Sequence, residues 1–494
     1  MKKQLKELLE QVDFQLVQGD LTQEITDVVY DSRKAKAGCV FVCMVGAVSD
    51  GHRFLDEVIQ KGAVAVIVEK EVEVPAGITV VYVKNAREAL AYMSAAYFEY
   101  PCKKMVSIGI TGTKGKSTVS HMIRETLERA GKRVGIIGTI GAFINGKELE
   151  TQNTTPQSYE LHRFFHMMVE EGCEYMVMEV SSQGLKLDRT AGIEFDYGVF
   201  TNLSPDHIGK GEHADFAEYL SCKALLFRQC KAGIGNIDDE HFSEVFKNAT
   251  CRVVTFGTDA RADLRASHIE HVSNGGDLSM EFDADGIMKG TIIVGLPGRF
   301  NIYNAMCATA VCVELGISKE IILHALEHVK VRGRVEPMDV GEDFSVLIDY
   351  AHNEISARSV LTTLREYKPN RIISIFGCGG CRSRERRYTM GEAIGELSEL
   401  SIITADNPRT ENVLDIIEDI KLGMHRSGGK YVAIPDRQEA VTYAISQAEK
   451  GDMIILLGKG HEDYQEINGV KYHYGEREAV ANAVKEVFGK SIKY

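Results

Sequence analysis

Short apolar runs alternate with amphipathic segments along the chain. Runs of β-branched and aliphatic residues, such as Ala63–Val68 and Arg371–Phe376, have the length and composition of buried strands. Segments between such runs, for example Phe216–Phe227, repeat apolar residues at the spacing of one helix face. Buried strands that alternate with helices predict an α/β fold built on parallel sheets.

The first hundred residues are expected to form a small α/β domain. Met1–Glu10 should begin a charged amphipathic helix, and strands are predicted at 27–30, 39–43, 63–68 and 79–83. The polar turn Asp31–Arg33 follows the first of these strands. An arginine beside a serine at a strand end can contact an oxyanion or a sugar, although the turn can equally be a simple connection.

A strand, a loop, a helix and a second strand open the central part of the chain. The strand Met105–Ile110 leads into a glycine-containing turn, the helix Ser117–Ala130 follows, and Val134–Ile137 forms the next strand. This βαβ order predicts a parallel sheet with ligands at the carboxyl ends of its strands. Further strands are predicted at 175–180 and 197–201, and residues 250–296 are expected to add antiparallel strands at the edge.

The basic, glycine-containing segment Val331–Glu336 is interpreted as a hinge before a third α/β region. Its strands are predicted at 346–349, 371–376, 401–404, 431–434 and 453–457. Polar loops at 350–354, 377–387, 405–409 and 458–463 follow four of them, so we expect a second binding surface at one sheet edge. A chain of 494 residues, at about 100–200 per domain, should contain three domains, placed at 1–100, 101–332 and 333–494.

Composition excludes several classes of protein. A hydrophobic content of 44% and a charged content of 26% are those of a soluble globular protein. No run of about 18 apolar residues occurs and the N-terminus lacks the features of a signal peptide, so we expect a cytoplasmic protein without membrane insertion. The formal charge of −14 argues against a nucleic-acid partner.

The eleven cysteines are scattered without a framework spacing, so most should be reduced and buried. Cys378 and Cys381 alone have the spacing of a zinc or redox pair. A zinc site needs two further ligands, and no second close pair of Cys or His completes one. A metal or redox module at this pair is therefore kept only as an alternative, which stoichiometric zinc or a titratable disulfide would support.

The stretch Val106–Val119 has the properties of a phosphate-binding loop. Gly112 and Gly115 let the backbone approach an anion, and N–H groups at the following helix N-terminus can cradle its oxygens. Lys116 can reach the terminal phosphates. The common motif has a further glycine where this chain has Ile110, and the alternative interpretation is a glycine-rich turn with a solvated lysine.

Candidate metal ligands follow the same and neighbouring strands. Ser117 or Thr118 would hold magnesium beside the phosphates. Glu179 lies in an otherwise apolar strand, where a cation would compensate a buried carboxylate. His207 follows the next strand and suits a structural role as well as a ligand role. Lys223, taken by itself, is interpreted as a solvated helix lysine.

Nine motifs occur in one order along the chain and together resemble the Mur ligases, the ATP-dependent amino-acid ligases of peptidoglycan precursor synthesis. They are Asp31–Arg33, Gly112–Thr118, Asn153–Pro156, Met178–Ser182, Asp206–His207, Cys222–Lys223, Asp349–His352, Asp406–Arg409 and Gly458–Glu466. The resemblance covers essentially the full chain. It is strongest to the members that add 2,6-diaminopimelate to UDP-N-acetylmuramoyl-L-alanyl-D-glutamate.

The resemblance implies a UDP-sugar-binding first domain, a central P-loop ATPase domain and a Rossmann-like third domain that binds the amino acid and closes over ATP. It implies ATP contacts at Gly112, Thr113, Lys114, Gly115, Lys116, Ser117, Thr118, Asn301, Arg334, Asp349 and His352. It implies substrate contacts at Ser32, Asn153, Thr154, Thr155, Ser181, Arg189, Arg387, Asp406, Asn407, Pro408, Arg409, Gly458 and Glu462. Magnesium ligands are implied at Ser117, Glu179, His207 and Lys223, the last as a carbamylated lysine.

The implied reaction begins when the D-glutamyl γ-carboxylate takes the γ-phosphoryl group of ATP. Lys116, Glu179, His207 and Lys223 are the implied catalytic residues, and the amine of meso-diaminopimelate then attacks the acyl phosphate. Arg409 is implied to select this amine, because a guanidinium can grip the second carboxylate that lysine lacks. The protein is expected to be a monomer.

The sequence departs from the family pattern at Gln183, Leu187, Asn353–Ile355, Cys381 and Ser383. These departures bear on substrate contacts and leave every phosphate, metal and carbamate residue in place. One alternative is a related ligase that adds lysine, or one of the folylpolyglutamate or cyanophycin type. An alternative from another class is a nucleotide-binding scaffold that has lost catalysis.

Overall fold

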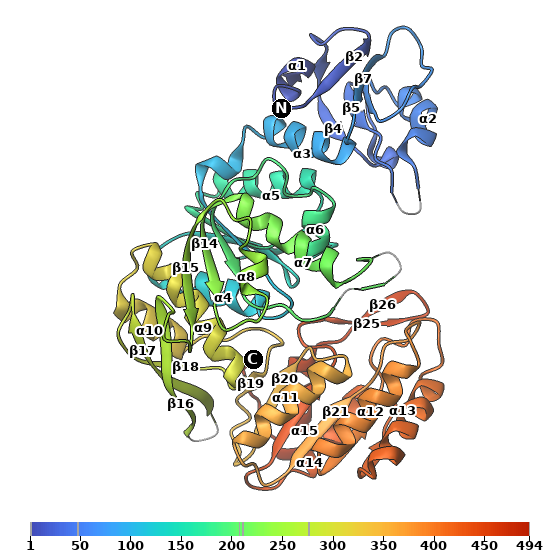
Figure 1. Ribbon diagram of the computed structural model, residues 1–494. Coiled ribbons are helices and arrows are strands. Elements are labelled where there is room, and N and C mark those ends of the chain that lie inside the picture. The colour runs from blue at the N-terminus through green and yellow to red at the C-terminus, as the bar shows by residue number, and fades with distance from the viewer. Residues whose placement is uncertain (1, 47–48, 207, 210–211, 275–276, 494) are drawn as a thin grey trace. The chain divides into compact units, whose positions relative to one another are not determined.

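The computed structural model describes residues 2–46, 49–206, 208–209, 212–274 and 277–493. The chain forms two compact units (Figure 1). The first contains residues 1–265 and 306–322, and the second contains residues 266–305 and 323–494. In the described residues, no helix is long and apolar enough to cross a membrane.

The N-terminal sheet has five strands in the order β2-β7-β6-β5-β4. Their bounds are Phe14–Gln18 for β2, Asp27–Val29 for β4, Cys39–Val42 for β5, Ala65–Val68 for β6 and Thr79–Val83 for β7. Strands β4 to β7 are parallel and β2 is antiparallel to β7. The short helices are η1 (Ser32–Lys34), η2 (Gly51–Phe54), α2 (Leu55–Gln60) and η3 (Pro101–Lys104), and the longest is α3 (Ala86–Tyr97). The four predicted strands are confirmed.

The predicted N-terminal helix is much shorter than expected. Helix α1 spans only Leu5–Leu8, because the residues before it form strand β1 (Lys3–Gln4), which pairs with β3 (Glu24–Ile25). Glu7 Oε2 accepts a hydrogen bond from the backbone N–H of Gln4 at 2.8 Å, which caps the helix start. Backbone pairing at distant positions thus decides where this helix begins.

The central sheet contains the strand order β11-β10-β9-β12-β8-β13-β14-β15. The bounds are Val106–Thr111 for β8, Val134–Gly138 for β9, Gly141–Ile144 for β10, Lys147–Leu149 for β11, Tyr175–Glu179 for β12, Phe195–Phe200 for β13, Cys230–Asn236 for β14 and Arg252–Gly257 for β15. The six strands from β9 to β15 are parallel, and β10 and β11 are antiparallel additions. The predicted βαβ unit and parallel sheet are confirmed, with β8 in the middle.

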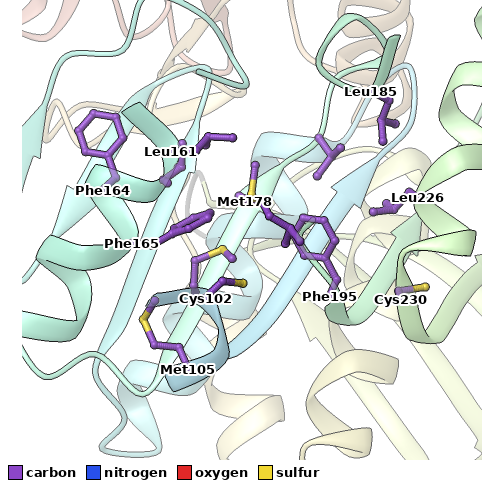
Figure 2. Close-up of a cluster of buried hydrophobic side chains, with 14 of the residues drawn as sticks. Cys102, Met105, Leu161, Phe164, Phe165, Met178, Leu185, Phe195, Leu226 and Cys230 are labelled. Atoms are coloured by element: carbon purple, nitrogen blue, oxygen red, sulfur yellow. The ribbon is translucent and has the colours of Figure 1, made fainter. Parts of the chain in front are cut away.

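Helices of the first unit cover this sheet and connect its strands. They are α4 (Lys116–Arg129), α5 (Ser158–Glu170), α6 (Ser182–Lys186), α7 (Phe216–Ala224), η4 (Leu225–Arg228) and α8 (Phe242–Val245). Figure 2 shows the core beneath them, where Phe165 of α5, Met178 of β12 and Phe195 of β13 are fully buried. Burying aromatic and aliphatic side chains of this size stabilises the fold by about 1.5–3 kcal/mol each. The buried layer holds the strand ends, and therefore the loops that follow them, in place.

The second unit has a six-stranded sheet in the order β19-β20-β24-β21-β22-β23. The bounds are Glu336–Met338 for β19, Ser345–Asp349 for β20, Ile372–Phe376 for β21, Leu400–Ile403 for β22, Tyr431–Ala433 for β23 and Met453–Leu457 for β24. Strands β20 to β24 are parallel and β19 is antiparallel to β20. The five predicted strands are confirmed, and their parallel order places the four polar loops at one sheet edge.

Helices α11 (Glu354–Glu366), α12 (Glu385–Leu397), α13 (Val413–Ser427), α14 (Arg437–Ser446) and α15 (Glu476–Phe488) complete this region, with a hairpin of β25 (Tyr464–Ile467) and β26 (Val470–His473). The predicted antiparallel strands are present as β17 (Asp277–Gly286) and β18 (Gly290–Val294), preceded by β16 (Leu264–Asn274). Helices α9 (Arg299–Glu314) and α10 (Lys319–Glu327) follow them.

Candidate functional site

The turn after β8 can be formed only with glycine at its two bends. Gly112 has φ 149° and Gly115 has φ 87°, both in the region that favours glycine. A Cβ atom on Gly112 would lie 1.9 Å from Thr201 Oγ1. Helix α4 begins directly after Gly115, so its first N–H groups face the turn, as in an anion-binding loop.

Two lysine amines meet at this turn. Lys116 Nζ donates to Gly112 O at 2.9 Å and to Thr113 O at 3.1 Å, and Lys223 Nζ donates to Gly112 O at 2.8 Å. Lys223 is 2% exposed and its amine lies over the Tyr219 ring. Burial, with a smaller contribution from the positive charge of Lys116, lowers the pKa of Lys223 well below its usual value. The interpretation of Lys223 as a solvated lysine is therefore wrong.

Glu179 ends strand β12 with its carboxylate buried beside the same turn. It accepts hydrogen bonds from Ser117 Oγ at 2.8 Å and from Thr139 N and Oγ1, both at 3.0 Å. All three donors are neutral, although the residue is only 2% exposed. A buried carboxylate beside a serine hydroxyl fits a hard divalent cation such as Mg²⁺. His207, the other predicted histidine ligand, lies outside the described residues.

The predicted substrate residues of the first unit form a hydrogen-bonded chain to the end of β12. Thr155 Oγ1 donates to Glu179 O at 2.8 Å and accepts from Ser181 N at 2.9 Å. Arg189 Nη1 donates to Thr155 O at 2.7 Å. Thr154 Oγ1 lies 3.0 Å from Thr139 Oγ1, the hydroxyl that also reaches the Glu179 carboxylate. These side chains are thus coupled to the predicted metal ligand.

The other predicted residues of this unit lie at several places. Thr113 Oγ1 is 3.0 Å from Tyr219 OH, and Lys114 N donates to Asn202 Oδ1 at 3.0 Å. Thr118 is buried in α4, whereas Asn153 is exposed. Ser32 belongs to η1 beside the N-terminal sheet, where its carbonyl accepts from Lys61 Nζ at 2.9 Å. The arginine of the same turn, Arg33, is paired with Asp31 at 2.7 Å and is highly exposed.

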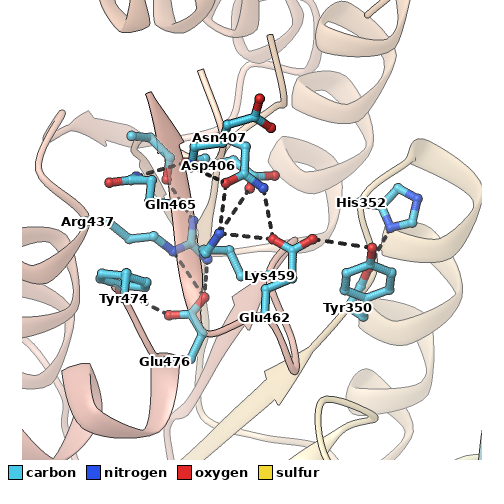
Figure 3. A network of polar contacts seen from close by, with 12 residues as sticks. Tyr350, His352, Asp406, Asn407, Arg437, Lys459, Glu462, Gln465, Tyr474 and Glu476 are labelled. Carbon is cyan, nitrogen blue, oxygen red and sulfur yellow. Dashed lines mark hydrogen bonds and ion pairs between the residues drawn. The ribbon is translucent and has the colours of Figure 1, made fainter. Parts of the chain in front are cut away.

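In the second unit, the predicted amino-acid residues surround a buried lysine (Figure 3). Lys459 is fully buried and its Nζ lies 3.0 Å from Glu462 Oε2 and 3.2 Å from Asn407 Oδ1. Asn407 Nδ2 donates to the same Glu462 oxygen at 2.8 Å, and Asp406 Oδ1 lies 3.8 Å from the lysine. Gly458, with φ 113°, directly follows β24 and lies beside Asp406, so the loops after β22 and β24 are joined by this network.

Arg409 is held in a left-handed backbone conformation, with φ 53°. Its Nη1 donates to Gly380 O at 2.7 Å, its Nε lies 3.3 Å from Glu466 Oε2, and its backbone N–H donates to Glu466 O at 2.9 Å. A pocket of about 620 Å³ beside this loop is lined by Pro408, Thr410 and their neighbours. The predicted discriminating loop therefore borders a ligand-sized cavity.

Arg387 is buried and already engaged by two acids. Its Nη2 donates to both Glu411 oxygens at 2.8 and 2.9 Å, and its Nη1 donates to Asp419 Oδ2 at 2.9 Å. Glu411 in turn accepts from the backbone N–H of Cys381. In this arrangement Arg387 supports the loop around Glu411, and a direct substrate contact stays a prediction.

The segment at the predicted hinge packs against the end of β20 and the loop that follows it. Asp349 Oδ2 accepts from Val335 N at 2.8 Å, and the Arg334 guanidinium lies over the Tyr350 ring at 5.5 Å. His352 Nδ1 bonds Tyr350 O at 2.8 Å. Asn353 is one of the residues that depart from the family pattern. Its side-chain oxygen accepts a hydrogen bond from Ser356 N at 2.9 Å, so it caps the N-terminus of helix α11.

Asn301, an ATP contact implied by the resemblance, is buried near the start of α9. It lies inside α9, is 2% exposed, and donates through Nδ2 to Pro297 O at 2.7 Å. Asn304 Nδ2 donates to Asn301 Oδ1 at 2.9 Å. Both amides thus hold the start of α9 from within, and contact of Asn301 with ATP stays a prediction.

Three buried residues of the second unit were not singled out by the sequence. Lys459 stood inside a recognised motif without a role, while Arg437 and Glu476 carried no signal at all. Arg437 Nε donates to Glu476 Oε1 at 3.0 Å, and its other nitrogens reach Ala405 O at 3.1 Å and Leu457 O at 2.9 Å. Arg437 therefore links Glu476 to the loop after β22 and to the end of β24, and Figure 3 shows its pairing with Glu476.

All eleven cysteines are free. Cys378 is buried, with its Sγ 3.8 Å from Met390 Sδ, and burial raises the pKa of this thiol to about 12. Cys381 is exposed and its Sγ lies 3.1 Å from Thr410 Oγ1. The two thiols therefore occupy different environments, which offers no support for a shared metal or redox module.

The glycine turn, the buried acid and the two lysine amines on a parallel sheet fit a nucleotide-binding site, and the comparisons identify the class as ligases. Residues 24–98 match the model described as "Mur ligase family, catalytic domain", residues 110–312 match "Mur ligase middle domain", and residues 333–460 match "Mur ligase, glutamate ligase domain". The chain belongs to the Mur ligase family.

Similar proteins carry one particular name. UDP-N-acetylmuramoyl-L-alanyl-D-glutamate--2,6-diaminopimelate ligase 1 of Clostridium acetobutylicum is 40% identical over 487 residues, 98% of this chain and 100% of the relative. The ligase of that name from Caldanaerobacter subterraneus subsp. tengcongensis is 40% identical over 97% of both chains. A solved structure of a UDP-N-acetylmuramoyl-L-alanyl-D-glutamate--2,6-diaminopimelate ligase has 27% identity and a TM-score of 0.72, and covers 98% of this chain and 99% of that one.

Proposed function

We propose that this chain is an ATP-dependent, ADP-forming ligase that adds meso-2,6-diaminopimelate to UDP-N-acetylmuramoyl-L-alanyl-D-glutamate in the cytoplasm. The observation that carries the proposal is 40% identity over 98% of the chain to a relative named for this reaction. The proposal assigns UDP-sugar binding to residues 1–100, ATP binding to 101–332 and amino-acid binding to 333–494, in a protein that acts as a monomer.

The turn from Gly112 to Thr118 would hold the ATP phosphates. Backbone N–H groups at the start of α4 bind the phosphate oxygens, and Lys116 leaves its two carbonyl partners to neutralise charge on the transferring γ-phosphoryl group. The D-glutamyl γ-carboxylate attacks the γ-phosphorus, which yields ADP and an acyl phosphate. Asn301, Arg334, Asp349 and His352 are also proposed to contact ATP.

Magnesium would be held by Ser117, Glu179, His207 and Lys223, and when bound it supplies positive charge to the phosphate oxygens. The neutral hydrogen-bond donors around the buried Glu179 carboxylate support a cation there. Lys223 suits carbamylation, because burial lowers the pKa of its amine and so favours the neutral form that reacts with carbon dioxide. That amine adds carbon dioxide and loses one proton, and the product is an oxygen ligand with a negative charge.

The chain Asn153–Thr155, with Ser181, Arg189 and the distant Ser32, is proposed to bind the UDP-muramoyl substrate. On the other unit, Asp406–Arg409, Gly458, Glu462 and Arg387 are proposed to position diaminopimelate. Its amine attacks the acyl phosphate carbonyl, an amide bond forms and phosphate leaves. Arg409 carries the one guanidinium of its loop. Two parallel hydrogen bonds from this group to the second carboxylate of diaminopimelate would distinguish it from lysine, which lacks that carboxylate.

An ADP-release assay with the UDP-muramoyl-dipeptide and a panel of amino acids tests this proposal. Turnover with meso-diaminopimelate and far less with L-lysine or L-glutamate is expected. Turnover with lysine alone would contradict the amino-acid assignment and leave the ligase class intact. ATP binding without amide formation from any amino acid would instead favour a scaffold that has lost catalysis.

A further inference from the structure

We infer that the C-terminal turn of α10 is a binding site for a divalent transition-metal ion, Zn²⁺ in particular, formed by His324, Glu327 and His328. One ligand atom from each of these side chains lies within 4.8 Å of the other two. Among the described residues, no other three His, Cys, Asp or Glu side chains meet this spacing. The three residues lie outside every motif assigned to ATP, magnesium or substrate.

The helix itself brings the ligands together. Positions i, i+3 and i+4 lie on one helix face, so His324, Glu327 and His328 project from the same side of α10 and its end. All three are exposed, whereas Ala325 and Leu326 are buried on the opposite face. The ligand face is therefore open to an ion from solvent, while the core contacts of the helix hold the backbone that carries it.

A backbone hydrogen bond prepares one imidazole for metal binding. His328 Nδ1 lies 2.9 Å from the His324 carbonyl oxygen. A carbonyl oxygen can only accept, so Nδ1 must carry the proton and Nε2 of the neutral ring presents its lone pair. Metal-bound histidines typically donate their second N–H to a carbonyl or carboxylate in this way. The neighbouring ring of His324 lies with its centroid 4.4 Å away.

Charge and ligand type favour the same class of ion. The last turn of a helix carries partial negative charge on its free carbonyls, which attracts a cation. Glu327 adds a formal negative charge, and its Oε2 lies 3.9 Å from His328 Nδ1. Two imidazoles and one carboxylate match Zn²⁺, which takes nitrogen and oxygen ligands at four positions, while Mg²⁺ prefers oxygen ligands only. Water would complete the coordination.

The test is a calorimetric titration of the metal-free full chain with ZnCl₂, in buffer that contains excess Mg²⁺. One zinc ion per chain should bind, and His324→Asn or His328→Asn should weaken binding by about 10- to 100-fold or more, since even loss of an outer partner has that effect. Glu327→Gln should weaken it less. His268→Asn is the matched control, because His268 is also exposed and pairs with a single carboxylate, Asp283, at 3.1 Å. This variant should bind zinc with the affinity of the unchanged chain.

A second measurement identifies the ligands directly. Cu²⁺ added in place of zinc should show nitrogen splitting from two imidazoles in its electron paramagnetic resonance spectrum, reduced in either histidine variant. Unchanged zinc affinity in the His324→Asn/His328→Asn double variant, with circular dichroism equal to that of the parent, would overturn the inference. Complete displacement of zinc by Mg²⁺ would overturn it as well. Neither outcome depends on ligase activity.

Discussion

Replacement of Arg437 by methionine should destabilise the second unit strongly. Arg437 is 2% exposed and Glu476 is 1% exposed. Burial alone would lower the pKa of Arg437, and the facing Glu476 carboxylate raises it instead. Methionine removes the bonds to Glu476, Ala405 O and Leu457 O, and leaves the carboxylate with the Tyr474 hydroxyl at 3.2 Å. Breaking a buried pair in this way costs about 3–5 kcal/mol.

Urea unfolding followed by circular dichroism measures this loss, with two further variants for comparison. The double variant Arg437→Met/Glu476→Leu removes both charges and should recover most of the stability. Arg358→Met breaks exposed pairs with Glu354 and Glu396 and should cost less than about 1 kcal/mol. A loss below about 1 kcal/mol in Arg437→Met, or no recovery in the double variant, would refute this account of the ion pair.

Four further outcomes are expected. Lys223→Ala should abolish ADP release, and added bicarbonate should fail to restore it; substantial residual turnover would contradict the role of this amine. Arg409→Lys should raise the KM for diaminopimelate by about 10- to 100-fold, the equivalent of about 1.5–3 kcal/mol for a charge-assisted contact, with a smaller change in kcat; an unchanged KM would argue against selection by Arg409. Gly112→Ala should remove ATP binding in a nucleotide titration, because its Cβ would meet Thr201. Burial lowers the pKa of His162 to about 3, so below pH 6.5 the unfolded chain binds a proton that the folded chain does not. Stability should therefore fall between pH 6.5 and pH 3, by up to about 5 kcal/mol from this group, and His162→Leu should flatten that part of the profile in unfolding experiments.

Much of the fold could be predicted from local pattern. Strand positions in both parallel sheets follow from short apolar runs, and the strand-turn-helix order around Gly112 predicts where the loop lies relative to the sheet. The predicted N-terminal helix is longer than the observed one, because the pairing between β1 and β3 that shortens it depends on residues far apart in sequence. Periodicity within ten residues carries no information on such a partner.

The site shows a similar division. Glu179 could be predicted as unusual because it interrupts an apolar strand, yet its contacts with Ser117 and Thr139 depend on three strands of one sheet lying side by side. Arg437 and Glu476 could not be found, since a charged residue at the start of a helix is ordinarily solvated. Only the packed sheet shows that both are buried.

The sequence by itself determined the apolar runs, the glycines at the turn, and the set of motifs that resembles one ligase family. The tertiary structure decided the state of the charged groups. Lys223 is a lysine on an amphipathic helix until packing removes it from water and places its amine 2.8 Å from Gly112 O, a carbonyl oxygen that also accepts from Lys116 Nζ. The cost of desolvation, which depends on everything packed around a group, lowers the pKa of that amine, and no local pattern records it.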